Sequence, residues 1–124
     1  MATVEITSEN FEDTVTEHSI VIIDFWAAWC GPCRAFAPIF EAFSEEHEDV
    51  VFGKCDVEAN GELSTQFQIQ AIPTLHVYRE QILVFSQPGM LPEPAFKELI
   101  EKVKGLDMDE VRAEIEKQEQ QEVN

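Results

Sequence analysis

Apolar residues in the first 105 positions fall into short continuous runs and into groups at helical spacing, and the two kinds alternate along the chain. A short continuous run predicts a buried strand, whereas apolar positions three and four apart predict a helix with one face in the core. The run at residues 19–26 is β-branched and aromatic apart from Ser19 and Asp24, as in a central strand with both faces covered. Strands that alternate with helices in this way predict an α/β layer architecture.

The pattern also places the individual elements. The predicted strands are residues 4–6, 19–26, 50–57, 74–78 and 82–85. The predicted helices begin near residue 9, at the Cys30 and Cys33 pair, near residue 60 and at residues 92–94. A tight connection at Arg79-Glu80-Gln81 should join the last two strands as an antiparallel hairpin. Thr7 or Ser8 can cap the first helix, and Gly105 suits the end of the last one. Pro38 lies within the second helix and should bend it, because proline cannot donate the backbone hydrogen bond.

The composition changes after residue 105. Residues 107–124 hold seven acidic residues against two basic ones, a net charge of −5. A thin apolar stripe at helical spacing consists of Met108, Val111 and Ile115. We therefore expect a domain of residues 1–105 and an acidic, helical extension of residues 106–124, frayed from residue 118 onward. The stripe can pack back on the domain or mediate association, and a solvated tail is an equal alternative.

The overall charge narrows the classes of partner. The 124 residues include 25 acidic and 8 basic ones, a formal charge of −17. Such a surface argues against nucleic acid and anionic membrane, because both attract basic surfaces. No run approaches the ~18–20 apolar residues of a membrane span, and the first residues lack the features of a signal peptide. We expect a cytoplasmic protein.

Three cysteines are too few, and odd in number, for the disulfide framework of a small secreted protein. Cys30 and Cys33 are separated by two residues, and this spacing indicates metal binding or redox chemistry. A zinc ion normally needs two further ligands. The other candidates are scattered and form no second close pair: Cys55, His18, His47 and His76. Redox chemistry is therefore favoured, with no metal and no bound cofactor.

The Cys30 and Cys33 pair follows a predicted strand and leads into a predicted helix. Disulfide exchange needs one thiolate that attacks and a second thiol that resolves the mixed disulfide. Free N–H groups and the dipole at a helix start favour a thiolate there, so Cys30 is the expected exposed nucleophile and Cys33 the shielded resolving thiol. Pro32 stiffens the loop and favours a helical first turn, while Gly31 leaves room for a substrate disulfide.

Three segments stand out together. They are Val21–Arg34, which contains Trp29-Cys30-Gly31-Pro32-Cys33, then Ala71-Ile72-Pro73-Thr74, and finally Gly89. At these separations they resemble the active-site segment, the cis-proline loop and a motif glycine of the thioredoxin family. The resemblance covers about residues 3–105. It implies the thioredoxin fold, a mixed β-sheet of about five strands flanked by helices.

The resemblance also implies roles for single residues. Asp24 resembles the buried carboxyl group that handles the proton of the resolving thiol, and burial should raise its pKa and make it a usable general base. Lys54 matches the family lysine that lies near this carboxyl and eases its ionisation. Pro73 resembles the cis-proline that exposes the backbone of Ile72 to an extended substrate peptide. A flat apolar docking surface around Cys30 is implied, formed by Trp29, Gly31, Pro32, Ile72, Pro73, Gly89 and Met90.

The activity implied by the resemblance is reduction of protein disulfides. Electrons would come from NADPH through a flavoprotein thioredoxin reductase and pass to disulfide-containing protein substrates. Gly31-Pro32 is the family's reducing type; without a histidine between the cysteines the disulfide is the more stable form, and the dithiol is a good reductant. We expect a monomer. Two alternatives are a dedicated electron donor or redox sensor for one partner, and a non-enzymatic binding or chaperone-like subunit.

The chain departs from the family's pattern at four places. Ala28 stands where an acidic or small polar residue is usual, and Ala71 where glycine is common. Glu80-Gln81 replaces a turn that often contains glycine, which leaves the type of the hairpin turn open. Cys55 is an additional cysteine on a predicted central strand, where a buried, inert thiol is favoured over a regulatory one.

Overall fold

The computed structural model describes residues 2–123. Its elements are β1 (Val4–Glu5), α1 (Phe11–Glu17), β2 (Ile20–Trp26), α2 (Gly31–Glu46), β3 (Val51–Asp56), α3 (Gly61–Gln66), β4 (Thr74–Arg79), β5 (Ile82–Pro88), α4 (Glu93–Lys104) and α5 (Met108–Val123). The five strands form one sheet in the order β1-β3-β2-β4-β5. β1, β3 and β2 are parallel, whereas β4 and β5 are antiparallel to their neighbours, so the sheet is mixed as expected.

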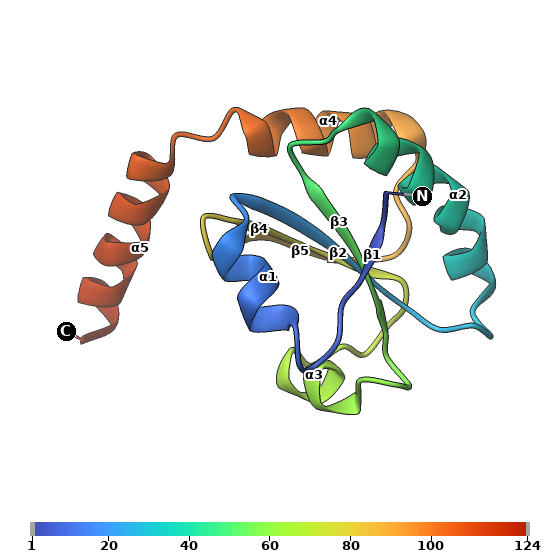
Figure 1. Ribbon diagram of the computed structural model, residues 1–124. Helices are drawn as coiled ribbons and strands as arrows, with labels where there is room; N and C mark the ends of the chain where they lie inside the picture. The colour runs from blue at the N-terminus through green and yellow to red at the C-terminus, as the bar shows by residue number, and fades with distance from the viewer. Residues whose placement is uncertain (1, 124) are drawn as a thin grey trace.

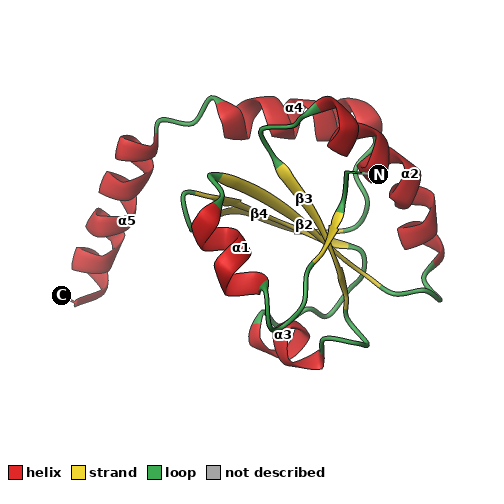
Figure 2. Cartoon of the chain, in the orientation of Figure 1, coloured by secondary structure: helices red, strands yellow, loops and turns green. Residues whose placement is uncertain are grey.

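Helices cover both faces of the sheet (Figure 1). α1 and α3 lie on one face and α2 and α4 on the other, while α5 projects from the end of α4 (Figure 2). The side chains of β2, the central strand, alternate between these two layers because successive residues of a strand point to opposite sides. Ile20 and Ile22 join the core beneath α2 and α4, whereas Val21, Ile23 and Phe25 join the core beneath α1 and α3. The continuous apolar run therefore marks a strand with two covered faces.

Phenylalanine side chains fill most of the layer beneath α2 and α4. Phe36, Phe40, Phe52 and Phe96 pack with ring centroids 5.3 to 6.2 Å apart. Each aromatic pair of this kind contributes about 0.5–1.5 kcal/mol beyond its buried area. α2 continues through Pro38, and this aromatic core fixes the helix, and therefore its first turn, over the sheet.

The start of α1 is held by a reciprocal pair of hydrogen bonds. The backbone N–H of Asn10 donates to Thr7 Oγ1 at 3.2 Å, and the backbone N–H of Thr7 donates to Asn10 Oδ1 at 2.8 Å. The exchange of bonds resembles that of a capping box, placed in the turn before the helix. The N-cap of α1 is Asn10, so neither Thr7 nor Ser8 holds the position expected of it, and α1 begins at Phe11, two residues later than predicted.

The hairpin between β4 and β5 has a two-residue loop. Arg79 belongs to β4, and the loop consists of Glu80 and Gln81, with φ of 51° and 72°. Two successive residues with positive φ are typical of a type I′ turn, whose twist matches that of the flanking strands. The turn type left open by the sequence is thus one that normally favours glycine or asparagine. Because the loop residues Glu80 and Gln81 are neither of these, each of them costs about 1–2 kcal/mol of backbone strain.

The extension is helical, as expected. Gly105 is the C-cap of α4, although its φ of −87° makes no use of the left-handed freedom of glycine. Asp107 immediately precedes α5, and its Oδ1 accepts two backbone N–H groups of the first turn at 3.0 and 3.2 Å. Against the expectation of fraying from residue 118, α5 continues to Val123, and Asn124 lies outside the described residues. The apolar stripe is covered, with Met108 buried and Val111 and Ile115 partly buried.

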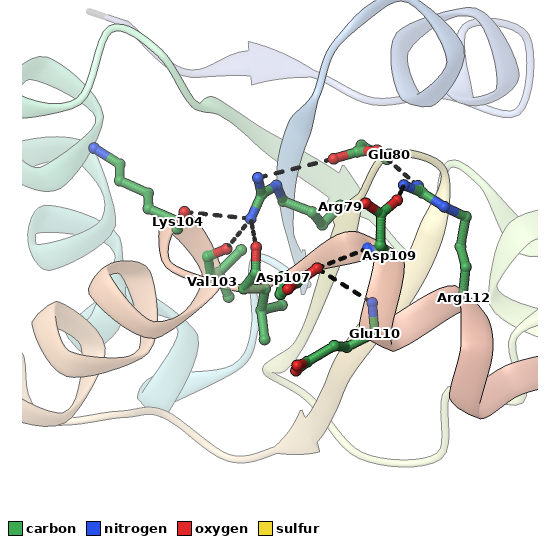
Figure 3. A network of polar contacts seen from close by, with 9 residues as sticks. Arg79, Glu80, Val103, Lys104, Asp107, Asp109, Glu110 and Arg112 are labelled. Atoms are coloured by element: carbon green, nitrogen blue, oxygen red, sulfur yellow. Dashed lines mark hydrogen bonds and ion pairs between the residues drawn. The ribbon is translucent and has the colours of Figure 1, made fainter.

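A charged network joins α5 to the hairpin (Figure 3). Arg79 Nη1 donates to three carbonyls at the end of α4, those of Val103 at 2.6 Å, Lys104 at 3.3 Å and Leu106 at 3.2 Å. The Arg79 guanidinium also lies 3.8 Å from the Glu80 carboxylate, which accepts from Arg112 on α5 at 2.8 Å. Arg112 donates further to Asp109 at 2.9 Å. Arg79 therefore supplies both hydrogen-bond donors and a positive charge at the negative end of α4.

Candidate active site

Cys30 and Cys33 occupy the first turn of α2. Cys30 is the N-cap, with φ −86° and ψ 114°, and Pro32 stands within the first two helical positions. The two cysteines form a disulfide, with Cα atoms 5.2 Å apart. The backbone N–H of Cys33 points to Cys30 Sγ at 3.2 Å. When the disulfide opens, this N–H and the positive end of the helix dipole stabilise a thiolate on Cys30.

Solvent exposure does not separate the two cysteines. Cys30 is 4% exposed and Cys33 3% exposed in the disulfide form. The expected exposure of Cys30 is therefore wrong for the disulfide form of the protein. What is exposed is the rim around it: Trp29 is 66% exposed, and Gly31 and Pro32 are also exposed. The difference between the cysteines lies in their partners.

The loop before β4 lies against Cys30. The Ile72–Pro73 peptide bond is cis, and the Ile72 carbonyl oxygen is 3.6 Å from Cys30 Sγ, close enough to accept from a Cys30 thiol. Gly89, just after β5, has φ of 92° and donates its backbone N–H to the Pro73 carbonyl at 2.7 Å. A positive φ of this size explains why glycine stands there. The structure thus brings together Cys30, Ile72, Pro73 and Gly89.

The remaining docking residues surround this group. Trp29 precedes Cys30 and Met90 follows Gly89, and Met90 is 36% exposed. Ile72 is partly buried and Pro73 is buried. Large apolar side chains with this much exposure are uncommon in the rest of the described chain, where Val4 and Leu83 are the other examples. Of the four, Trp29 is adjacent to Cys30 in the sequence and Met90 follows the glycine that holds the Pro73 loop, so both are suited to contact with a partner.

Asp24 is a buried acid without a hydrogen-bond partner. It shares the α2 and α4 face of β2 with Ile22, because residues two apart on a strand point the same way. It is fully buried, and neither carboxylate oxygen has a partner among the described residues. Burial raises the pKa of Asp24 from 3.8 to about 7, and the positive charge of Lys54 lowers it. A carboxyl group that titrates near neutral pH can both take and return a proton.

Lys54 lies on β3 directly beside Asp24. The strands pair in register, with Lys54 opposite Asp24. The Lys54 ammonium is 4.9 Å from the centre of the Trp26 ring, on the face of the indole. Trp26 Nε1 is buried and has no hydrogen-bond partner among the described residues. Trp26 was missed from the sequence as part of this group, although its position two residues after Asp24 on a strand was a signal.

A second contact missed from the sequence involves Arg34. Its Nη1 donates to the Ala28 carbonyl at 2.9 Å and so bridges the loop that leads into α2. The residue types do not predict this hydrogen bond, because Arg34 and Ala28 are both exposed.

Cys55 is separate from the redox pair. It is fully buried beneath α1 and α3, as expected for an inert thiol. Burial, with the charges of Asp56 and Asp24, raises the pKa of Cys55 to about 11. In the described residues no three His, Cys, Asp or Glu side chains lie close enough to hold a metal ion. The same residues include no helix that is long and apolar enough to cross a membrane.

Comparison with known proteins agrees with this geometry. The family model described as thioredoxin matches residues 2–102. A protein of Streptomyces coelicolor named putative thioredoxin 2 is 52% identical over 120 residues, which are 97% of this chain and 90% of that protein. The thioredoxin of Bacillus subtilis is 37% identical over 103 residues, or 82% of this chain and 98% of that one.

Solved structures give the same result. A thioredoxin of Plasmodium falciparum has a TM-score of 0.74 and 34% sequence identity, and covers 81% of this chain and 97% of its own. A thioredoxin variant of Halobacterium salinarum has a TM-score of 0.77 and 30% identity, over 85% of this chain and 93% of its own. α5 lies beyond the residues that the family model matches.

Proposed function

The chain belongs to the thioredoxin family, and from this premise we propose that it is a general protein-disulfide reductase recharged by an NADPH-dependent flavoprotein thioredoxin reductase. Its activity as a thiol–disulfide oxidoreductase follows from the family and from the Cys30–Cys33 disulfide at the start of α2. The environment of this cysteine pair is the observation that supports reduction, rather than formation, of substrate disulfides. It has a helix N-terminus to stabilise the thiolate and no histidine between the cysteines to stabilise it further.

The reaction proceeds in two exchange steps. The Cys30 thiolate attacks one sulfur of the substrate disulfide, which forms a mixed disulfide and releases the first substrate thiolate. Asp24 then takes the proton of Cys33, and the Cys33 thiolate attacks Cys30 Sγ. The Cys30–Cys33 disulfide forms and the second substrate thiolate leaves. Two electrons pass from the cysteines to the substrate, and the two released thiolates take up two protons.

The other predicted residues position the reactants. Lys54 eases ionisation of Asp24. The docking surface around Cys30 binds an extended segment of substrate, and Ile72 offers its backbone next to Cys30. The members of this surface are Trp29, Gly31, Pro32, Ile72, Pro73, Gly89 and Met90. Hydrogen bonding of Gly89 to Pro73 supports this surface because it fixes the loop at Cys30. A surface of this kind binds many partners with modest affinity.

Residues 1–105 form the redox domain in this proposal, and residues 106–124 an appended helix. The chain acts as a monomer, and its buried, unpaired Cys55 fits the reducing cytoplasm.

Insulin reduction tests the proposal. With dithiothreitol as reductant the protein should accelerate precipitation of the insulin B chain, and with NADPH it should do so only in the presence of a thioredoxin reductase. Cys30→Ser should abolish both activities, whereas Cys55→Ala should retain them. The reduction potential of the pair should lie below about −200 mV, more reducing than disulfide donors. A strongly oxidising potential, or no turnover with any thioredoxin reductase, would contradict the reductase.

A dedicated redox partner is the second candidate, and α5 favours it because this helix lies outside the family model. A Cys33→Ser variant cannot resolve its mixed disulfides and will retain its substrates. Many adducts indicate a general reductase, and one dominant adduct indicates a dedicated donor.

A further inference from the structure

Lys54 on β3 lies near three carboxylates, one on each of the strands β1, β2 and β3. In the β1–β3 pairing it is opposite Glu5, and in the β2–β3 pairing it is opposite Asp24. Asp56 follows two residues later on the same face of β3. One ammonium group is therefore within reach of three carboxylates, and the side on which it settles determines which acid it stabilises.

The two competing carboxylates are more accessible than Asp24. Glu5 is exposed and Asp56 is partly buried, and both border a pocket of about 350 Å³ together with Lys54 and Trp26. Asp56 is already engaged, since its Oδ1 accepts the backbone N–H groups of Glu58 at 2.9 Å and Ala59 at 3.4 Å. Ion pairs at exposed sites contribute little, whereas a charge beside a buried carboxylate acts at low dielectric.

The Trp26 ring lies next to the Lys54 ammonium. It lies two residues after Asp24 on β2 and therefore on the same face, and Lys54 Nζ sits 4.9 Å from its centroid. Lys54 forms no ion pair within 4.0 Å in the described part of the chain. A cation over an indole face is attracted by the ring quadrupole and keeps this position without a carboxylate contact.

We propose that Trp26 is a positioning residue for the proton transfer at Cys33: its indole face holds the Lys54 ammonium beside Asp24 and away from Glu5 and Asp56. This inference rests on the proposed role of Asp24. Without the ring, the ammonium moves to the solvent side of β3, and Asp24 loses the positive charge that favours its ionised form. Trp26 thus sets the pH at which Asp24 accepts the proton of the resolving thiol.

The surroundings of Asp24 leave few other sources of charge. From β3 it faces Lys54, with the neutral thiol of Cys55 nearby. From β4 its partner is Leu75, which is apolar. Cys30 and Cys33 in the first turn of α2 carry no charge as a disulfide.

A double-mutant cycle on the disulfide form tests the inference. The variants are Trp26→Leu, Lys54→Met and the double variant, and the readout is the titration midpoint of the Asp24 side-chain carbon by NMR of ¹³C-labelled protein. Trp26→Leu should raise the midpoint by about half to one pH unit, as expected for loss of one cation–π-held charge. Lys54→Met should raise it at least as much, and adding Trp26→Leu to Lys54→Met should raise it no further. Trp26→Phe keeps an aromatic face and should restore most of the original midpoint.

An unchanged midpoint in Trp26→Leu would overturn the inference. So would an equal rise in the Lys54→Met background, since the ring would then act by burial alone. The unaltered protein gives a test that does not depend on folding of a variant: the Lys54 Hε protons should be shifted upfield by the indole ring current, and random-coil shifts would overturn the proposal. None of these readings requires turnover. A failed insulin assay with the expected midpoints would count against the reductase function and not against the role of Trp26.

Discussion

Charged side chains near the two ends of β2 have opposite environments, one buried and unpaired, the other paired in a network. Near the C-terminal end of β2, toward the cysteine pair, the Asp24 carboxylate is fully buried without a hydrogen bond to any residue that the structure describes. At its N-terminal end, the hairpin meets Ser19 through the Glu80 backbone N–H at 2.7 Å. There Arg79 and Glu80 are paired with each other, with Arg112, and with the carbonyls that end α4. An unpaired buried acid costs stability but can exchange a proton near pH 7, whereas a paired network stabilises a junction and has no proton to exchange. The difference separates the reactive end of the domain from the end that holds the extension.

Removing the buried charge should produce the largest effect. A pKa raised from 3.8 to about 7 means that ionised Asp24 costs up to about 4 kcal/mol of stability above pH 7, at 1.36 kcal/mol per pH unit. The unfolded state releases this proton first, so the cost is absent below pH 3.8 and grows as the pH rises toward 7. Asp24→Asn should therefore raise the free energy of unfolding by several kcal/mol at pH 8 and hardly at all at pH 4, as measured by urea denaturation.

The same variant should lose the general base. Resolution of a trapped mixed disulfide at pH 7 should slow about 100-fold or more in Asp24→Asn, measured by stopped-flow fluorescence. A variant that is more stable yet resolves at the original rate would show that the buried acid has no part in proton transfer.

Breaking the network at the other end should have the next largest effect, with the opposite sign. Arg79→Met removes a donor from three carbonyls and the positive charge 3.8 Å from the Glu80 carboxylate, and the loss should be about 2–3 kcal/mol of stability. Hydrogen exchange should accelerate at the end of α4 and the start of α5. Insulin reduction per folded molecule should stay unchanged, and a large loss of activity would show that the two ends are coupled.

A smaller effect, a gain in stability, should come from a substitution in the hairpin turn. Gln81→Gly relieves the positive φ of 72°, and it should stabilise the protein by up to about 1 kcal/mol, partly offset by the greater freedom of glycine in the unfolded chain. Gln81→Ala is the matched control, because it removes the side chain and keeps the strain.

The smallest effect belongs to Arg112→Gln. The Arg112 and Glu80 side chains are 49% and 38% exposed, and exposed pairs are weak and screened by salt. Urea denaturation should hardly change, while hydrogen exchange in α5 should become faster at low salt and converge with the parent at high salt. A marked loss of global stability would place α5 within the cooperative core.

Local patterns in the chain predicted the layers and the redox pair because each depends on neighbouring residues. The strand with two covered faces is visible in Ile20–Trp26, and the helix start is visible in Gly31-Pro32. Roles that depend on register were harder to predict. The strand spacing of Asp24 and Trp26 and the family resemblance of Lys54 were signals, but the meeting of all three residues depends on the parallel pairing of β2 with β3.

The hairpin turn and the low exposure of Cys30 also differ from what the residue types suggest, because both depend on tertiary geometry. Glu80 and Gln81 accept a left-handed turn against their preference because the register of β4 and β5 leaves only two residues for the loop. The low exposure of Cys30 could not be predicted, because it depends on the loop that carries Ile72 and closes over the sulfur from a distant part of the chain.

Because Cys55 is buried, the reactivity of this third thiol reports whether the chain is folded. Its side chain is fully buried and its pKa is raised to about 11, so a water-soluble chromogenic thiol reagent will not reach it in the native protein. Reduced native protein should consume two equivalents of such a reagent, and each chain that opens should consume a third. The stoichiometry of labelling therefore counts unfolded molecules in a sample without any added probe.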